Sequence, residues 1–165
     1  MSELTRDNFH KFGNSRDDAH IIIPSVITSI GKRAFYNCMN LEKITIPDTV
    51  KSIGNEVFFN CYSLESIVIP DSVTSMGYWM FYCCKNLKNV IIGRSVTKVA
   101  PYTFHTCKSL ENVTILGSVT EIGEAAFGEC TSLKTIKVPA NRGDYFKTLL
   151  PEDLHDLIVE FPDGQ

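Results

Sequence analysis

The sequence contains no long hydrophobic run, no strongly charged segment and only one tryptophan among 165 residues. A transmembrane helix needs about 18 or more consecutive apolar residues, and no window approaches that length, so we expect no membrane insertion. The net charge of −3 gives no clustered basic face of the kind that nucleic acid requires, so we expect no nucleic-acid partner. The first residues, MSELTRDNFHKF, are polar and mixed in charge, unlike a secretory signal peptide.

The chain also lacks the usual residue patterns of catalysis and cofactor binding. No glycine-rich phosphate loop is present, and His10, His20 and His155 are scattered along the sequence. His105 and Cys107 are close in sequence, but Cys107 belongs to a regular series that we expect to be buried and unreactive. No C-x-x-C spacing suggests zinc. We therefore expect a protein with no enzymatic activity, no cofactor and no metal site.

What the sequence does contain is one unit repeated every 23 residues. ITIPDTVKSIGNEVFFNCYSL (Ile44–Leu64) is followed by IVIPDSVTSMGYWMFYCCKNL (Ile67–Leu87). A fixed period of this length indicates a solenoid, in which units stack because each lacks a second layer to bury its apolar side chains. Five units span residues 21–138. We expect residues 1–20 to form an N-terminal cap and residues 139–165 a C-terminal cap.

Each unit is predicted to contain two extended segments and one outer turn. Two apolar columns alternate with polar positions at the start of the unit, the pattern of a strand with one buried face. A shorter extended segment, V-x-x-I-G, ends in a turn where we expect glycine to supply unusual backbone angles, although Ala100 replaces glycine in one unit. The third segment, A-F-x-x-C-x-x-L, has helical spacing and predicts a short helical turn. Its phenylalanine column is unbroken: Phe35, Phe58, Phe81, Phe104 and Phe127.

Five of the six cysteines recur with the same period, namely Cys38, Cys61, Cys84, Cys107 and Cys130. We interpret them as a ladder of reduced thiols, in which each cysteine fills the same buried position as a small apolar side chain. Disulfides between neighbouring rungs are an alternative, because strand-like stacking places rungs about 4.8 Å apart, within the Cα range of a disulfide. An odd number of rungs cannot pair completely, and this favours the reduced form.

The two ends of the chain depart from the repeat. Ser2 is placed to cap a short helix over Glu3–Phe12, which Gly13 would stop. After the last repeat we expect one or two short helices, with Pro151 at a helix start. A final strand is expected near Leu157–Phe161. Both ends carry apolar residues that would cover the exposed end of a stack.

The unit L-x-x-I-x-I-P-x-x-V-x-x-I-G-x-x-A-F-x-x-C-x-x-L resembles the BspA-like class of leucine-rich repeats. It stands here as LEKITIPDTVKSIGNEVFFNCYSL (Leu41–Leu64), and the resemblance covers Ile21–Val138. It implies an α/β solenoid: a curved, right-handed coil with a parallel sheet on the concave side and short helical turns on the convex side. It also implies a bacterial or protozoan surface protein that binds host matrix or other cells. The implied location is the cell surface or outside the cell, although this chain shows no signal peptide.

Alternation along the strands predicts which residues face outward on the concave sheet. Val68 and Ile91 lie side by side there with polar neighbours, the usual anatomy of a modest protein interface. The alternative is an ordinary solvated sheet whose β-branched residues reflect strand propensity. The predicted partner-binding residues of this sheet are Lys43, Ser66, Val68, Asn89, Ile91, Asn112 and Thr114.

A second candidate site is a group of aromatic residues on the outer turns. Tyrosine and tryptophan are enriched at binding hot spots, and flat rings can stack on sugar faces. The alternative is that these rings lean over the turns and cover the edges of the core. A binding platform here requires Trp79 to be more than half exposed. The aromatic outer group consists of Tyr36, Phe59, Tyr78, Trp79, Tyr82 and Tyr102.

The sequence thus predicts a non-catalytic scaffold that binds a protein ligand, with a role in adhesion at a cell surface. Two alternatives stay open: a glycan-binding module that uses the aromatic outer group, and a purely structural segment of a longer repeat array. Arg142, Gly143 and Asp144 spell the tripeptide that integrins recognise. A match of three residues arises readily by chance and does not change this prediction.

Overall fold

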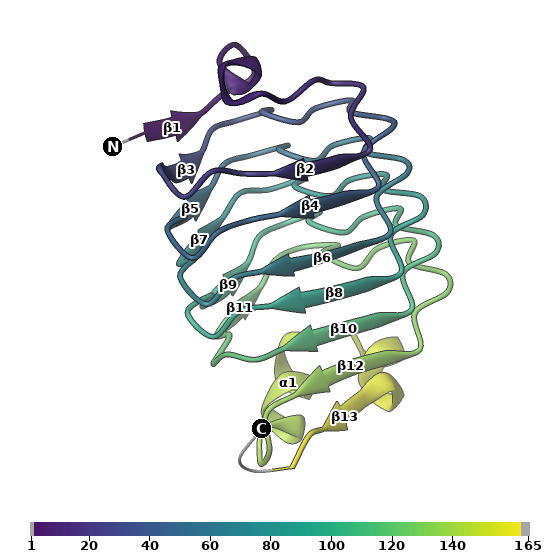
Figure 1. Cartoon of the computed structure of the whole chain (residues 1–165). Coiled ribbons are helices and arrows are strands. Elements are labelled where there is room, and N and C mark those ends of the chain that lie inside the picture. The colour runs from purple at the N-terminus through teal and green to yellow at the C-terminus, as the bar shows by residue number, and fades with distance from the viewer. Residues whose placement is uncertain (1, 163–165) are drawn as a thin grey trace.

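A computed structural model describes residues 2–162, which form a stack of parallel coils (Figure 1). A coil contributes two strands before its outer turn. The first strands are β2 (His20–Ile22), β4 (Lys43–Thr45), β6 (Ser66–Ile69), β8 (Asn89–Ile92), β10 (Asn112–Ile115) and β12 (Thr135–Val138). The second strands, called the short strands because all but β3 have two residues, are β3 (Ile27–Ile30), β5 (Ser52–Ile53), β7 (Ser75–Met76), β9 (Lys98–Val99) and β11 (Glu121–Ile122). The predicted solenoid of parallel strands is confirmed.

The strand register repeats from coil to coil. Val113 of β10 pairs in parallel with Val90 of β8 and with Ile136 of β12, so residues one period apart lie side by side. These three inward-facing side chains are at most 1% exposed. The neighbouring coil therefore supplies the apolar wall that a single unit lacks, and both extended segments predicted for each unit are present.

The core consists of columns of identical side chains that run along the stack. The five phenylalanines of the predicted column stack face to face, with ring centroids 5.2–5.5 Å apart. All five are buried because neighbouring rings cover their faces. Burial of apolar surface is the main favourable contribution to the free energy of folding, so this column is central to the stability of the stack.

The cysteine column forms a ladder of free thiols. Four of its sulfurs donate a hydrogen bond to the carbonyl oxygen of a core phenylalanine in the preceding coil. The pairs are Cys61 with Phe35 (3.2 Å), Cys84 with Phe58 (3.1 Å), Cys107 with Phe81 (3.0 Å) and Cys130 with Phe104 (3.1 Å). Burial raises the pKa of these thiols, that of Cys130 to about 12. The ladder agrees with the reduced form favoured above, and its thiols are protonated and unreactive at neutral pH.

The outer turns contain no α-helix or 3-10 helix within the repeats. The short helical turn predicted from the spacing of their apolar residues is therefore wrong. Arg33 and Asn37 both have φ of 59°, in the left-handed region, and such residues interrupt a helix. The N–H groups of alternate residues bond to the next coil instead of bonding within the turn. Phe35, for example, donates to the carbonyl of Val57 at 3.0 Å. Bonding between coils therefore replaces bonding along a helix.

The glycines that follow the short strands do not supply left-handed backbone angles, so that prediction was wrong. They allow neighbouring coils to approach closely. A Cβ atom at Gly77 would lie 2.4 Å from the backbone nitrogen of Asn55, and one at Gly54 would lie 2.7 Å from that of Lys32. The first left-handed residue of each coil lies two positions further along the chain: Arg33, Glu56, Trp79, Tyr102 and Ala125.

Ala100 takes the glycine position of one coil, and the sheet of short strands is interrupted at that coil. β7 pairs with β5 and β9 pairs with β11, but within residues 2–162 β7 and β9 are not paired. A Cβ atom at the equivalent Gly77 or Gly123 would lie 2.4 Å from the backbone of the preceding coil. The methyl group of Ala100 therefore holds β9 away from β7.

The N-terminal segment begins with a strand, so the predicted helix over Glu3–Phe12 is wrong. β1 (Ser2–Leu4) pairs in parallel with β3, and the predicted cap Ser2 lies within it. A 3-10 helix, η1 (Phe9–Phe12), follows and ends at Gly13 with φ of 79°, as expected. A short isolated helix is only marginally stable in water. Pairing with the free edge of β3 instead gives the backbone of this segment hydrogen-bond partners.

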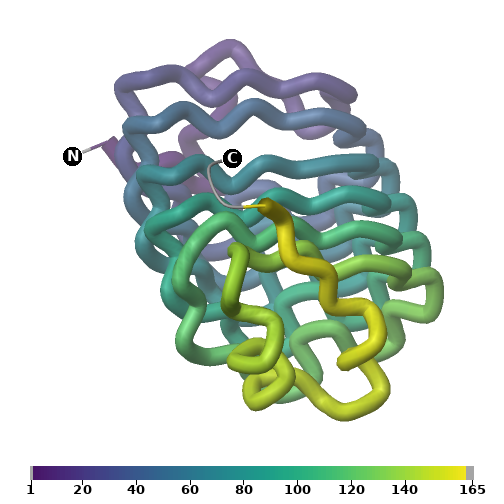
Figure 2. The backbone as a smooth tube through the Cα atoms, turned by 90° about the horizontal axis from the view of Figure 1, so that it is seen from below, coloured from purple at the N-terminus to yellow at the C-terminus, as the bar shows by residue number. Residues whose placement is uncertain are grey.

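The C-terminal segment contains the expected two helices and final strand. They are α1 (Gly143–Leu149), the 3-10 helix η2 (Glu152–Leu157) and β13 (Ile158–Glu160). β13 pairs with β12, and the carboxylate of Glu160 accepts hydrogen bonds from the N–H groups of Asn141 and Gly143 at the start of α1. Figure 2, seen from this end, shows the segment lying across the last coil. Within residues 2–162, no helix is long and apolar enough to cross a membrane.

Candidate functional site

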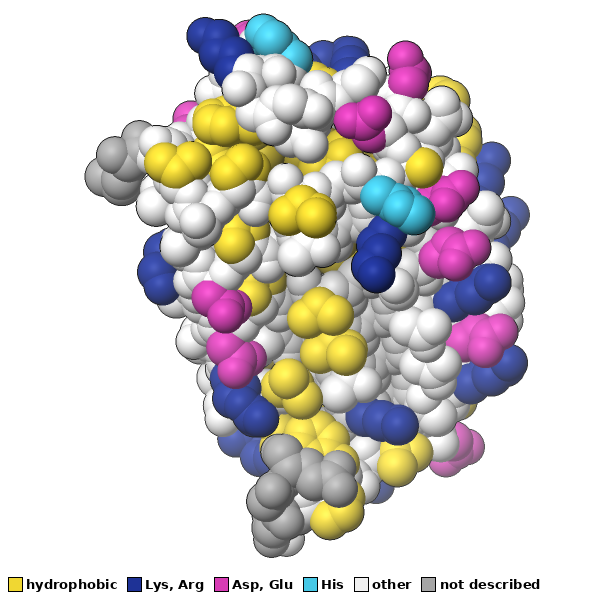
Figure 3. Space-filling view, in the orientation of Figure 1, with side chains coloured by type: hydrophobic (Ala, Val, Ile, Leu, Met, Phe, Trp, Pro, Cys, Tyr) yellow, Lys and Arg dark blue, Asp and Glu magenta, His cyan; other side chains and the backbone are white. Residues whose placement is uncertain are grey.

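The seven residues predicted to bind a partner on the sheet all lie on one face of the stack. We call it the strand face, the outward-facing side of β4, β6, β8 and β10. Figure 3 shows this face, with hydrophobic side chains in a column near its middle and acidic and basic side chains alternating along one edge. The exposed members are Lys43, Ser66, Val68, Asn89 and Ile91, and the partly buried members are Asn112 and Thr114.

Val68 and Ile91 form the apolar centre of the strand face. They are register partners in β6 and β8, and they are 55% and 37% exposed, respectively. Thr114 is the next register partner of Ile91, so a polar residue follows the pair along the column. Two exposed β-branched side chains in contact distance of one another present apolar surface that a partner would bury.

A hollow of about 740 Å³ lies beside this apolar pair. Val68 and Ile91 line it, and so do Ile44 and Ile67, whose side chains face the core. Core residues reach the hollow because β4 pairs with β2 and β6 pairs with β8, whereas β4 and β6 are not paired within residues 2–162. The strand pairing is therefore interrupted beside the hollow.

Two acidic residues that the sequence analysis missed, Asp48 and Asp71, line the hollow where β4 and β6 end. Asp71 pairs with the guanidinium of Arg94 at 3.3 Å. Asp48 takes part in no ion pair among the residues that the structure describes. Each follows the proline that ends its strand, Pro47 or Pro70. This repeated position in the sequence could have predicted that the two acidic residues lie together. The apolar centre thus has an acidic rim at one end.

The asparagines of the strand face bond to one another. The side-chain amide of Asn112 donates to Asn89 Oδ1 at 2.9 Å, and the hydroxyl of Thr135 donates to Asn112 Oδ1 at 2.7 Å. Cross-strand pairs of this kind stabilise a sheet. These side chains therefore order the starts of the strands, and the surface left for a partner centres on Val68 and Ile91.

The aromatic outer group is brought together on the turns. Five of its six members line a shallow hollow of about 490 Å³, namely Tyr36, Phe59, Trp79, Tyr82 and Tyr102. Tyr78 does not line the hollow but meets Trp79 edge to face, with ring centroids 6.2 Å apart. Arg33, Glu56 and His105 line it as well, although the sequence analysis did not select them.

Tyr36, Phe59, Tyr82 and His105 form a second stacked column. Successive ring centroids lie 5.1, 4.8 and 5.5 Å apart, with interplanar angles of 12–21°. A ring stacked on both sides presents its edge to solvent, whereas a sugar stacks on a ring face. Trp79 is 41% exposed, less than the half that a binding platform requires. The exposure of Trp79 is therefore too low for the aromatic outer group to serve as the predicted binding platform.

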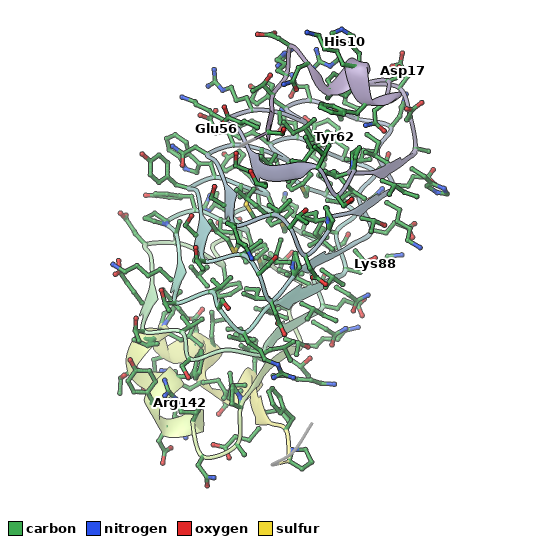
Figure 4. All side chains as sticks on the ribbon, turned by 60° about the vertical axis from the view of Figure 1, so that its left-hand side comes forward. His10, Asp17, Glu56, Tyr62, Lys88 and Arg142 are labelled. Carbon is green, nitrogen blue, oxygen red and sulfur yellow. The ribbon has the colours of Figure 1, made fainter. Side chains whose placement is uncertain are left out.

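Glu56 is a buried carboxylate beside the aromatic outer group. The guanidinium of Arg33 lies 2.6 Å from it and the ammonium of Lys32 lies 3.5 Å from it. In Figure 4, Glu56 lies on the other side of the stack from Lys88, which precedes β8. A buried charge held between two cations is compensated, so this cluster is a structural ion pair of the turns.

The integrin-type tripeptide lies at the start of α1, and its two charged side chains contact other residues of the same chain. The Arg142 guanidinium lies 4.1 Å from the ring centroid of Tyr145 and donates to the carbonyl of Val119 at 3.4 Å. Asp144 pairs with Lys147 at 3.1 Å. Figure 4 shows Arg142 within the C-terminal segment. The tripeptide is therefore part of a helix start, with the side chain of Asp144 exposed. Between residues 2 and 162, no three metal-ligating side chains gather.

Parallel strands on one side, turns on the other and a fixed register between coils define a leucine-rich-repeat solenoid. The BspA type leucine rich repeat region matches residues 9–146 in six copies. The chain therefore belongs to the BspA-type leucine-rich repeat family, and the resemblance found in its sequence is confirmed.

Solved structures of bacterial leucine-rich repeat proteins are similar to this chain. One from Bacteroides ovatus is 33% identical over 73% of this chain and 37% of its own, with a TM-score of 0.56. A leucine-rich cell surface protein from Faecalibacterium prausnitzii is 37% identical over 72% of this chain and 38% of its own, with a TM-score of 0.58. One from Eubacterium ventriosum is 23% identical over 90% and 45%, with a TM-score of 0.68, a likeness of fold alone. The chain spans less than half the length of each. No curated protein matches it.

Proposed function

We propose that this chain is a non-catalytic scaffold that binds a protein through the strand face. The observation that carries the proposal is the pair Val68 and Ile91, exposed side by side next to a hollow of about 740 Å³. An apolar centre within a polar rim is the usual anatomy of a protein interface. Membership of a leucine-rich repeat family supports a protein-interaction or surface repeat scaffold.

We infer that the partner is a protein of another cell or of a host matrix, and that the chain acts at a cell surface or outside the cell. One similar protein, from Faecalibacterium prausnitzii, is a leucine-rich cell surface protein, which supports this location. Adhesion needs a broad surface more than an enclosed pocket, and a stacked repeat provides such a surface.

Glycan binding by the aromatic outer group is not carried forward, because its rings stack on one another and Trp79 is less than half exposed. A purely structural spacer within a longer array remains the competing function. A spacer requires no partner on the strand face, so a binding experiment distinguishes the two.

The test is capture of a partner from a surface-protein extract of neighbouring or host cells by the immobilised chain. We compare the parent with the double variant Val68→Glu/Ile91→Glu, which places two charges in the apolar centre. The matched control is Val26→Glu/Met39→Glu, because these side chains are 56% and 48% exposed and do not line the hollow. All four positions are exposed, so circular dichroism and melting should show an intact fold for both variants.

The proposal predicts that the parent and the control capture the same protein and that the strand-face variant loses it by about 30-fold or more in affinity, as for a buried hot spot. Equal capture by the strand-face variant would contradict the proposed surface. If no version captures a partner, the spacer function is favoured and the binding proposal is overturned.

A further inference from the structure

The outer turns of neighbouring coils are joined by a regular row of backbone hydrogen bonds. In each coil except the last, three N–H groups at alternate residues donate to three carbonyl oxygens of the next coil. Between the last two coils the donors are Tyr102, Phe104 and Thr106, and the acceptors are Glu124, Ala126 and Gly128, at 2.8–2.9 Å. The same three bonds recur at each of the four interfaces between the coils.

The last coil carries the same donors without acceptors. The equivalent N–H groups belong to Ala125, Phe127 and Glu129, and none of them has a hydrogen-bond acceptor among residues 2–162. Ala125 and Glu129 have φ of 47° and 59°, like their counterparts in earlier coils, so the turn keeps its shape. A row of unpaired donors at the end of a stack is equivalent to the open edge of a sheet, which readily pairs with another chain.

A hollow of about 300 Å³ lies at these donors, and all three donor residues line it. The ring of Phe127 ends the phenylalanine column, so no further ring of that column covers its outer side. Leu149 and Leu154 of the C-terminal segment form much of the opposite wall. This segment lies across the end of the stack in Figure 2. The hollow is therefore lined by apolar side chains of the last coil and of the C-terminal segment.

The rim of this hollow is acidic. Glu129 and Asp153 line it and are exposed, and neither takes part in an ion pair among the residues that the structure describes. Glu124 is also exposed and precedes the first donor residue, Ala125. Carboxylates without a partner around an apolar hollow favour a ligand with positive charge.

We propose that this end of the stack binds an extended basic peptide segment that contains an aromatic residue. Carbonyl oxygens at alternate residues of the segment accept the N–H groups of Ala125, Phe127 and Glu129. Its aromatic side chain enters the hollow between the last coil and Leu149 and Leu154, and flanking lysine or arginine residues face Glu129 and Asp153. Main-chain bonds supply affinity and the side-chain pocket supplies selectivity, as when a peptide adds to a free sheet edge.

A second copy of the chain is not the occupant that we infer, although its first coil carries the complementary carbonyl groups of Lys32, Ala34 and Tyr36. The carbonyl of Tyr36 already accepts a hydrogen bond from Arg16 at 2.7 Å. Ala34 is fully buried, and Phe9 of the N-terminal segment packs on the first core phenylalanine. A second copy would have to displace this segment, whereas a peptide would not.

The probe is the peptide acetyl-Lys-Pro-Tyr-Thr-Phe-His-Thr-Lys-amide, which copies Pro101–Thr106 between two lysines. This segment supplies carbonyls from Pro101, Thr103 and His105 to the preceding coil, so it has the required backbone. We titrate it into the ¹⁵N-labelled chain and follow the amide signals. The expected result is a saturable downfield shift of the amide protons of Ala125, Phe127 and Glu129, with the inner row of Tyr102, Phe104 and Thr106 unchanged.

Two control peptides separate the contributions. Replacing the peptide's phenylalanine by alanine should weaken binding about tenfold or more, because that side chain is buried in the hollow. Replacing its lysines by glutamates should weaken binding at low salt. On the protein, Glu129→Lys/Asp153→Lys should weaken binding of the lysine peptide. The matched pair Asp7→Lys/Asp17→Lys, which changes the charge equally in the exposed N-terminal segment, should not.

Three results would overturn the proposal: no shift of the three amides at millimolar peptide, equal affinity for the alanine peptide, or the same shifts on raising the protein concentration without peptide. The last would identify a second copy as the occupant. The variant Val68→Glu/Ile91→Glu should bind the probe like the parent, so this site and the strand face succeed or fail separately.

Discussion

The rings of Phe58 and Phe81 stack with their centroids 5.2 Å apart and their planes inclined by only 5°. The next ring, Phe104, lies 5.3 Å beyond Phe81. Phe81 thus has a ring from the neighbouring coil on each face and no exposed surface. This relationship shows how the stack is built, because each coil covers the apolar side chains of the coil before it.

Removal of one inner ring should therefore destabilise the whole stack. Phe81→Ala is expected to lower the free energy of unfolding by about 3–5 kcal/mol, measured by urea denaturation. Phe127→Ala, at the end of the column, should cost less because only one face of its ring is stacked. A Phe81→Ala chain that melts within about 2 °C of the parent would contradict this account.

The repeat glycines should be intolerant of a methyl group wherever another coil's backbone faces them. Gly77→Ala is expected to cost about 1–3 kcal/mol or more, because its Cβ atom would lie 2.4 Å from backbone atoms of Gly54 and Asn55. Gly31→Ala is the matched control, since its nearest contact, at 2.8 Å, is the carboxylate end of the flexible Glu3 side chain. Thermal unfolding of the two variants measures the difference. Equal losses would show that close approach is not the reason for glycine.

The same steric argument predicts a gain of structure at Ala100. Ala100→Gly should let β9 approach β7, so that the N–H of residue 100 donates to the carbonyl of Met76, as Gly77 and Gly123 donate to Ile53 and Val99. The amide of residue 100 should then exchange with solvent more slowly than in the parent. Net stability should change little, because glycine costs roughly 0.5–1 kcal/mol of backbone entropy relative to alanine. Unchanged exchange at residue 100 would mean that the methyl group does not cause the interruption.

The thiol ladder should make the protein less stable at alkaline pH. Burial raises the pKa of Cys107 and raises that of Cys130 to about 12, whereas an unfolded thiol ionises near pH 8.5–9. Between these values the folded state binds more protons than the unfolded state. The free energy of unfolding should therefore fall as pH rises, by about 1.4 kcal/mol per pH unit for each buried thiol.

Urea denaturation between pH 8 and pH 11 measures this slope. Cys130→Ala should remove one thiol's share of it, and Thr131→Ala, an exposed neighbour, should leave it unchanged. An identical slope in Cys130→Ala and the parent would show that this thiol ionises alike in the folded and unfolded chains.

The columns of the core were predictable from the sequence because the same chemistry recurs at a fixed spacing. Phe35 alone could belong to many folds, but five phenylalanines one period apart require a common buried position. Alternation likewise placed Val68 and Ile91 on the outer side of the sheet. Both conclusions depend only on periodicity, which is a property of the sequence itself.

Features that depend on the neighbouring coil were not predictable from a single unit. Arg33, Glu56 and Trp79 share no local preference for left-handed backbone angles, and the conformation recurs because stacked coils have the same shape. The strand at Ser2–Leu4 forms because β3 offers it an edge. The interruption of pairing between β4 and β6 is recorded by no periodic pattern, because both strands keep the repeat sequence.

Hydrogen exchange of the free protein tests most directly the claim that each coil completes the one before it. The account predicts slow exchange for the amides of Tyr102, Phe104 and Thr106, which donate to the next coil, and fast exchange for Ala125, Phe127 and Glu129, which have no coil to donate to. Equal protection of the two rows, or faster exchange of the inner row, would contradict it.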